Sequence, residues 1–145
     1  MLIVTNNNKV YEKYNKKRDV LFLEDATYLQ VLEKVRNLVH EGAKLLTHPM
    51  AGSLKPNQTP YRSVMLNDYI AASFSSEKPS LDMQSLQLIE NSIEVTKKFI
   101  SYKTVPNWPL KIKEDFKTVD LSLIDSAINR SGGVSLETGI GKNQN

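Results

Sequence analysis

Short apolar runs alternate with helix-like segments through the first third of the chain. Residues 2–5 (LIVT), 19–24 (DVLFLE) and 43–47 (AKLLT) have the continuous apolar, partly β-branched character of buried strands. Residues 9–14 and 27–42 lie between them and carry apolar side chains at helical spacing. The order strand–helix–strand–helix–strand, joined by short links, favours parallel strands with right-handed crossovers. We therefore predict an α/β fold with a short, mostly parallel sheet flanked by helices, a Rossmann-like or flavodoxin-like sandwich of two or three layers.

The predicted helix ends carry residues with known capping roles. Thr27 and Gln30 have the spacing of a capping box, and Gly42 stands where a left-handed residue ends a helix. The strongest helical pattern covers residues 80–102, where two apolar stripes are separated by small side chains, as expected for a helix lying close on a sheet. A last helix is predicted over residues 120–130.

Residues 62–67 (RSVMLN) fit two interpretations. Thr59 and Pro60 could open a helix there, but the run Val64–Leu66 favours a fourth strand. Residues 69–74 would then pair with this strand or form an irregular excursion.

One domain accounts for the length of the chain. The 145 residues are enough to bury a sizeable core, and we expect a single α/β domain over residues 1–130. Residues 131–145 hold four of the six glycines and no aromatic residue, so we expect a flexible C-terminal tail.

Composition and charge exclude several classes of function. The absence of cysteine excludes disulfides, thiolate metal sites and thiol exchange by this chain, and two histidines without a clustered acidic motif argue against a metal site. The net charge of +3 comes largely from basic runs at residues 9–18 and 97–113, which lack interleaved stacking aromatics and are interpreted as solvated faces. No signal peptide or apolar run of membrane-spanning length is present. We expect a cytoplasmic protein that binds neither nucleic acid nor membrane and needs no cofactor.

The expected topology predicts where a ligand would bind. In open α/β sheets, ligands lie outside the carboxyl ends of the strands, where the strand order reverses. With the order 2-1-3, that place lies between the loops after the first and third strands, residues 5–8 and 47–61. The candidate ligand-binding residues from these loops are Asn6, Asn7, Thr47, His48, Gly52, Ser53, Lys55, Asn57 and Arg62.

Several of these residues also have a simpler interpretation. The asparagines precede a helix whose N-terminus favours an anion, but one of them could simply cap that helix. Gly52, Ser53 and Lys55 resemble part of a phosphate loop, yet no GxxxxGK[ST] motif is present, so an unrelated tight turn is the alternative. Pro49, Pro56 and Pro60 stiffen the long loop, which is either functional or packed over the sheet edge.

His48 is the one residue here with a suitable pKa range for general acid–base work. The sequence pairs it with no obvious nucleophile, because neither Thr47 nor Ser53 lies in a recognisable nucleophile motif. His40 lies in the last turn of a helix, where a cation is favoured in any case. No catalytic residue and no metal ligand are therefore assigned.

The segment LLTHPMAGSLKPNQTPYRS resembles the signature of the GrdX family, small proteins associated with clostridial glycine, sarcosine and betaine reductase systems. The stretches LIVTNNNKVYEKY, DVLFLED and LDMQSLQLIENSIEVTKKF are also similar, so the resemblance covers roughly residues 1–104. It implies a cytoplasmic protein of an anaerobic amino-acid fermenter that works alongside the reductase subunits. The resemblance assigns no catalytic residue to this chain. The positions that match the signature are Thr47, His48, Pro49, Gly52, Ser53, Lys55, Pro56, Asn57, Thr59, Pro60 and Tyr61.

Three hypotheses of function follow. The first, which we favour, is a non-enzymatic accessory protein that binds a small anionic ligand or a partner in the predicted cleft. The second is a small enzyme with His48 as acid or base and Lys55 or Arg62 stabilising negative charge. The third is a purely structural interaction module acting through the basic runs or the tail.

Overall fold

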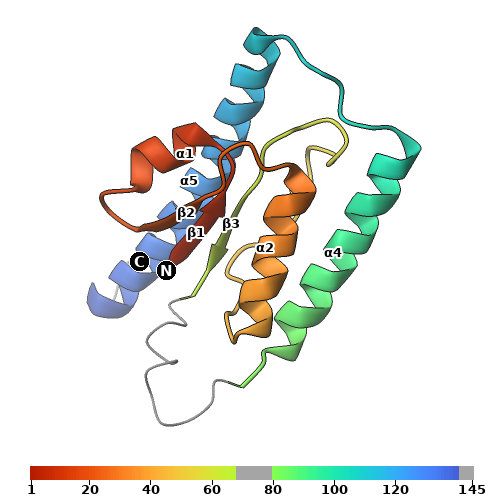
Figure 1. The fold of residues 1–145 in the computed structure, drawn as a ribbon. Helices are drawn as coiled ribbons and strands as arrows, with labels where there is room; N and C mark the ends of the chain where they lie inside the picture. The colour runs from red at the N-terminus through yellow and green to blue at the C-terminus, as the bar shows by residue number, and fades with distance from the viewer. Residues whose placement is uncertain (68–79, 141–145) are drawn as a thin grey trace.

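A computed structural model gives the backbone of residues 1–67 and 80–140 and the side chains of residues 1–67 and 80–131. The chain forms a mixed α/β fold with a small open sheet between helices (Figure 1). Its elements, in chain order, are β1 (Leu2–Thr5), α1 (Asn8–Tyr14), β2 (Asp19–Phe22), α2 (Tyr28–His40), β3 (Ser63–Leu66), α4 (Met83–Tyr102) and α5 (Leu110–Ile140).

The sheet has the strand order β2-β1-β3. β1 and β2 are parallel, with Thr5 opposite Phe22, as the sequence predicts. β3 runs antiparallel to β1, with Thr5 opposite Ser63, so the expected mostly parallel sheet is only partly parallel. The reason is that α2 leads the chain to the segment 43–47, and the long loop after this segment reverses the chain before β3, so Leu45 faces Leu66 in the antiparallel sense.

Residues 43–47 do not form the predicted third strand. They run beside β3 as an irregular edge, with one isolated bridge between Leu45 and Leu66. Their backbone bonds are divided between two elements. The Leu45 N–H donates to the side chain of Ser85 on α4 at 3.0 Å, and the Leu46 N–H donates to Met65 O of β3 at 2.8 Å. The third strand of the sheet is instead the run within residues 62–67, where the strand interpretation is confirmed. Residues 69–74 lie outside the described residues.

The predicted helix ends are confirmed in the first half of the chain. Asn7 caps α1, because its side chain accepts the Lys9 N–H at 3.1 Å. Thr27 and Gln30 form the capping box of α2. Gly42 adopts a φ of 114°, a conformation that favours glycine, directly after α2. α5 extends beyond the predicted 120–130 at both ends.

Alternating side chains of the strands supply two cores, one on each face of the sheet. Val4, Val64 and Leu66 pack with the apolar faces of α2 and α4. Ile3 and Met65 pack with α1 and with Ile124 and its neighbours on α5. The helices therefore cover both faces, α2 and α4 one and α1 and α5 the other (Figure 1).

α4 lies alongside α2, on the outer side of the molecule (Figure 1). Its small residues Ser85, Ser92 and Thr96 are buried, as predicted. They let α4 approach α2 and the edge segment around Leu45, while Ile89 and Ile93 of α4 share a core with the strand residues. None of the helices in the described part of the chain has the length and hydropathy needed to cross a membrane.

Candidate functional site

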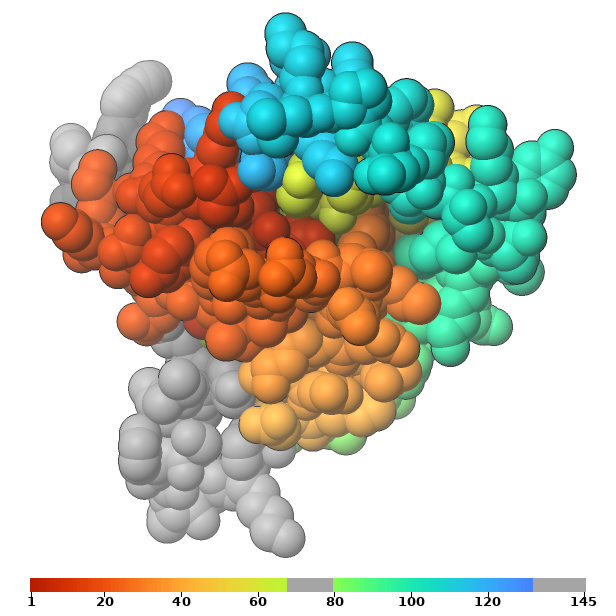
Figure 2. Space-filling model, turned by 45° about the horizontal axis from the view of Figure 1, so that its top comes forward, coloured from red at the N-terminus to blue at the C-terminus, as the bar shows by residue number. Residues whose placement is uncertain are grey.

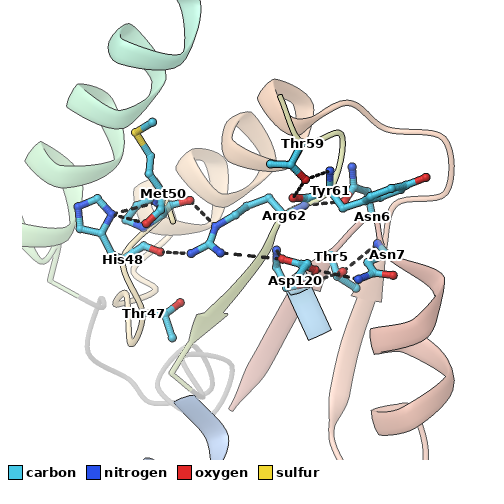
Figure 3. Close-up of polar contacts among 12 residues, drawn as sticks. Thr5, Asn6, Asn7, Thr47, His48, Met50, Thr59, Tyr61, Arg62 and Asp120 are labelled. Atoms are coloured by element: carbon cyan, nitrogen blue, oxygen red, sulfur yellow. Dashed lines mark hydrogen bonds and ion pairs between the residues drawn. The ribbon is translucent and has the colours of Figure 1, made fainter. Parts of the chain in front are cut away.

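A buried polar network joins the end of β1, the start of β3 and the middle of α5 (Figure 3). Its centre is Asp120, which is 3% exposed. The Asp120 carboxylate accepts the Ser63 N–H at 3.0 Å, the Ser63 hydroxyl at 2.7 Å and the Asn7 amide at 3.0 Å. Because a buried carboxylate is stable only when its oxygens are hydrogen-bonded, these contacts fix α5 against the sheet.

The hydroxyl groups of this network have one consistent direction of donation. Ser63 Oγ must donate its proton to Asp120, since an ionised carboxylate only accepts. The Thr5 hydroxyl, 2.7 Å away, therefore donates to Ser63 Oγ. Thr5 Oγ1 in turn accepts the Asn7 N–H at 2.9 Å. The chain Asn7–Thr5–Ser63–Asp120 leaves neither hydroxyl with a free proton.

Asn6 and Arg62 form the second half of the network. The Arg62 N–H donates to Asn6 Oδ1 at 2.9 Å, and the Asn6 amide donates to Ala26 O and Pro60 O at 2.8 and 2.9 Å. The Arg62 side chain is 8% exposed and reaches back to the loop, donating to Pro49 O and His48 O at 2.7 Å each. Its Nη1 lies 3.9 Å from Asp120 Oδ1.

Asn6 and Asn7 thus lie beside the end of the long loop, as the topology argument expects. The strand that brings the loop there is β3, and not the predicted strand over residues 43–47. Antiparallel β3 places Arg62 beside the carboxyl end of β1. Every polar side-chain atom of Asn6 and Asn7 is used within the protein, so these residues position backbone. The simpler interpretation, helix capping, is the role that Asn7 has.

The loop over residues 47–62 is held by contacts along its length. His48 Nδ1 lies 2.9 Å from Met50 N and 3.0 Å from Met50 O, so it can accept from one or donate to the other. Asn57 donates to Phe99 O at 3.2 Å, and the Trp108 indole N–H donates to Gln58 O at 2.7 Å. These anchors to α4 and to the segment before α5 fix the loop in place.

A groove of about 200 Å³ lies between this loop and α5; we call it the arginine groove. Its lining includes Arg62, Arg130 and His48 and contains no carboxylate. The Arg130 side chain makes no hydrogen bond or ion pair with the described residues. The full lining is Thr47, His48, Met50, Ala51, Gly52, Arg62, Ser63, Leu123, Ile124, Ala127 and Arg130.

The arginine groove continues into a wider hollow of about 600 Å³. The two share Thr47, His48, Ala127 and Arg130, and the hollow adds the apolar side chains of Leu46 and Met65. A molecule with a charged head in the arginine groove would thus have apolar surface beside it.

A second groove, of about 620 Å³, lies at the carboxyl ends of β1 and β2; we call it the carboxyl-edge groove. Figure 2 shows this hollow between the beginning of the chain, in red and orange, and the segment leading into α5, in cyan and blue. Asn6 and Tyr61 are among its lining residues. It shares no lining residue with the arginine groove.

The nine predicted site residues are therefore distributed over different surroundings. Thr47, His48, Gly52 and Arg62 line the arginine groove, and Asn6 lines the carboxyl-edge groove. The other four, which line neither groove, are Asn7, Ser53, Lys55 and Asn57.

Sequence reasoning missed Asp120 and Arg130. The signal for Asp120 was present: it stands four residues before Ile124, on the same helical face, so a charged residue interrupts an apolar stripe. Nothing comparable marks Arg130, whose role depends on how α5 lies against the loop. Within the described ranges, no cluster of three or more potential metal ligands occurs.

Comparison with known proteins gives one finding about family. A family model described as "GrdX-like protein" matches residues 2–129. No curated protein and no solved structure matches the chain.

Proposed function

Because the chain belongs to the GrdX-like protein family, we propose that it is a non-catalytic accessory protein that binds a small anion in the arginine groove. The observation that carries the proposal is the charge of the lining: the guanidinium groups of Arg62 and Arg130 line the groove, and the carboxylate that pairs with Arg62, Asp120 at 3.9 Å, is outside the lining. The loop that forms one wall is the segment that resembles the family signature.

The rigidity of Arg62 supports this choice. Its guanidinium is fixed by two backbone carbonyls, so the positive charge is held in one place before any ligand arrives. Arg130 is exposed and unpaired among the described residues, so it can turn towards a bound anion. A planar carboxylate or a phosphate suits such a pair, because guanidinium groups bind both with two hydrogen bonds.

Binding explains the geometry better than acid–base catalysis. Of the two residues that the enzyme hypothesis uses to stabilise negative charge, Arg62 lines the arginine groove and Lys55 lines neither groove. The lining holds two hydroxyl groups: that of Ser63 donates its proton to Asp120, and that of Thr47 accepts the Met65 N–H. Ser63 is also 1% exposed.

The ligand part of the proposal is tested by titrating the protein with inorganic phosphate and with acetate at constant ionic strength. Either anion should raise the melting temperature of the wild type. The rise should be largely lost in Arg130→Gln and kept in Arg36→Gln, a matched variant on α2 whose residue lines neither groove. Equal responses in the two variants would contradict the proposal.

The accessory role is a separate proposal and needs a separate test. We propose that the protein works alongside the subunits of a glycine, sarcosine or betaine reductase system, which is the setting that the family resemblance implies. Tagged protein should recover reductase subunits from an anaerobic lysate of a fermenting cell, as identified by mass spectrometry. If no reductase subunit is recovered above the level of an untagged control, the accessory role is contradicted, whereas the proposed anion site is not affected.

A further inference from the structure

The carboxyl-edge groove has a lining that the proposed anion site does not use. It lies where two parallel strands end, the position at which open α/β sheets commonly bind small molecules. Its volume of about 620 Å³ suits a small organic ligand. The lining residues are Asn6, Asn8, Tyr11, Glu12, Phe22, Glu24, Asp25, Ala26, Thr27, Tyr28, Pro60, Tyr61, Val105, Lys113 and Lys117.

Aromatic side chains form part of this lining. Tyr11 of α1 and Phe22 of β2 are stacked, with ring centroids 4.9 Å apart and planes inclined by 14°. Tyr11 is 38% exposed, so this pair offers apolar surface to the groove. Tyr61 also lines the groove, with the Lys117 ammonium 5.4 Å from its ring centre.

Charges of opposite sign reach the groove from different elements. Glu24 and Asp25 follow the end of β2, Lys113 and Lys117 lie in the first part of α5, and Glu12 of α1 adds a third carboxylate, which accepts a hydrogen bond from the Asn8 amide. Lys117 is paired with Glu114 at 3.0 Å. The side chains of Glu24, Asp25 and Lys113 have no ion pair within the described part of the chain.

This distribution selects one class of ligand. A purely anionic molecule would be repelled by the three carboxylates of Glu12, Glu24 and Asp25, and a purely cationic one by the lysines. A dipolar molecule satisfies both, and the aromatic surface adds attraction for an apolar group or an ammonium. We propose that the carboxyl-edge groove binds a small zwitterion of the amino-acid type. Its ammonium lies at Glu24 and Asp25, its carboxylate at Lys113, and its apolar group against Tyr11 and Phe22.

The test uses three molecules with the same phenyl group and different charged groups. L-Phenylalanine carries both charges, 3-phenylpropionate only the carboxylate and phenethylamine only the ammonium. We expect L-phenylalanine to shift the backbone amide NMR signals of Asn8, Asp25 and Thr27 and to bind about tenfold more tightly than either analogue. Absence of these shifts, or equal affinity for all three molecules, would overturn the proposal.

Two substitutions with a matched control locate the binding. Lys113→Ala and Asp25→Asn should each weaken L-phenylalanine binding by about tenfold. Asparagine is chosen because Asp25 has a φ of 64°, a conformation that asparagine tolerates. Lys111→Ala, on the same helix but outside the groove, should bind like the wild type. Equal losses in Lys111→Ala and Lys113→Ala would also refute the site, and the phosphate response of the arginine groove is unaffected by either result.

Discussion

Replacing Asp120 by alanine removes the centre of the buried network. The substitution leaves the Ser63 N–H, the Ser63 hydroxyl and the Asn7 amide without their acceptor, and Arg62 without its carboxylate. An unsatisfied buried donor costs roughly 1–3 kcal/mol, and breaking a buried charge pair roughly 3–5 kcal/mol. Because these costs overlap, we expect a loss of about 4 kcal/mol in the free energy of unfolding.

The loss is measured by urea unfolding followed by circular dichroism, with thermal unfolding as a check. At about 3 °C per kcal/mol for a domain of this size, the melting temperature should fall by about 12 °C. Asp115→Ala is the matched control on the same helix: its carboxylate is exposed and, among the side chains that the structure describes, pairs only with Lys111, so it should cost under about 0.5 kcal/mol.

A network that acts as a unit also predicts coupling. Ser63→Ala combined with Asp120→Ala should cost less than the sum of the two single changes, by about 1 kcal/mol or more. If Asp120→Ala proves no more destabilising than Asp115→Ala, the network does not hold α5 to the sheet and the reasoning is refuted.

Three further predictions concern single side chains. Thr27→Ala removes one bond of the capping box and should cost about 1 kcal/mol, measured by urea unfolding; an unchanged stability would contradict the cap assignment. Ile89→Ala opens a cavity in a fully buried position and should cost about 3 kcal/mol in the same assay. Burial, and then the hydrogen bond to Asp125, raises the pKa of Tyr14 from 10.0 to about 12. The unfolded chain therefore loses this proton first, so wild-type stability should fall between about pH 10 and 12 while Tyr14→Phe falls less; parallel pH profiles would show that Tyr14 is not responsible.

The strands and helices of the first 42 residues could be predicted because local patterns decide them. The run Leu2–Thr5, the capping box at Thr27 and the left-handed position at Gly42 each act over a few residues. The direction of β3 could not be predicted in this way, because it depends on the path of the loop between Lys44 and Arg62. Leu45 looked like a strand residue, yet its N–H is bound by a serine forty residues later in the chain.

In the candidate site, too, the residues in one loop could be predicted and a residue from a distant helix could not. The loop residues Thr47, His48, Gly52 and Arg62 were identified by their position after an apolar run, and the structure gathers these four along one groove. Arg130 was not identified from the sequence, because it lines the arginine groove only when α5 passes beside the loop. Local sequence says which residues are polar and constrained, whereas the packing of α5 decides which of them share a surface.

The most direct test of the anion site is an NMR titration of the wild-type protein with inorganic phosphate. The account predicts that the backbone amide signals of His48, Gly52 and Arg130 shift together and saturate, while those of Asn8 and Asp25 in the other groove stay in place. The same titration of Arg130→Gln should show much smaller shifts. Shifts that are spread over the basic residues without saturating, or that persist unchanged in Arg130→Gln, would contradict an anion site in the arginine groove.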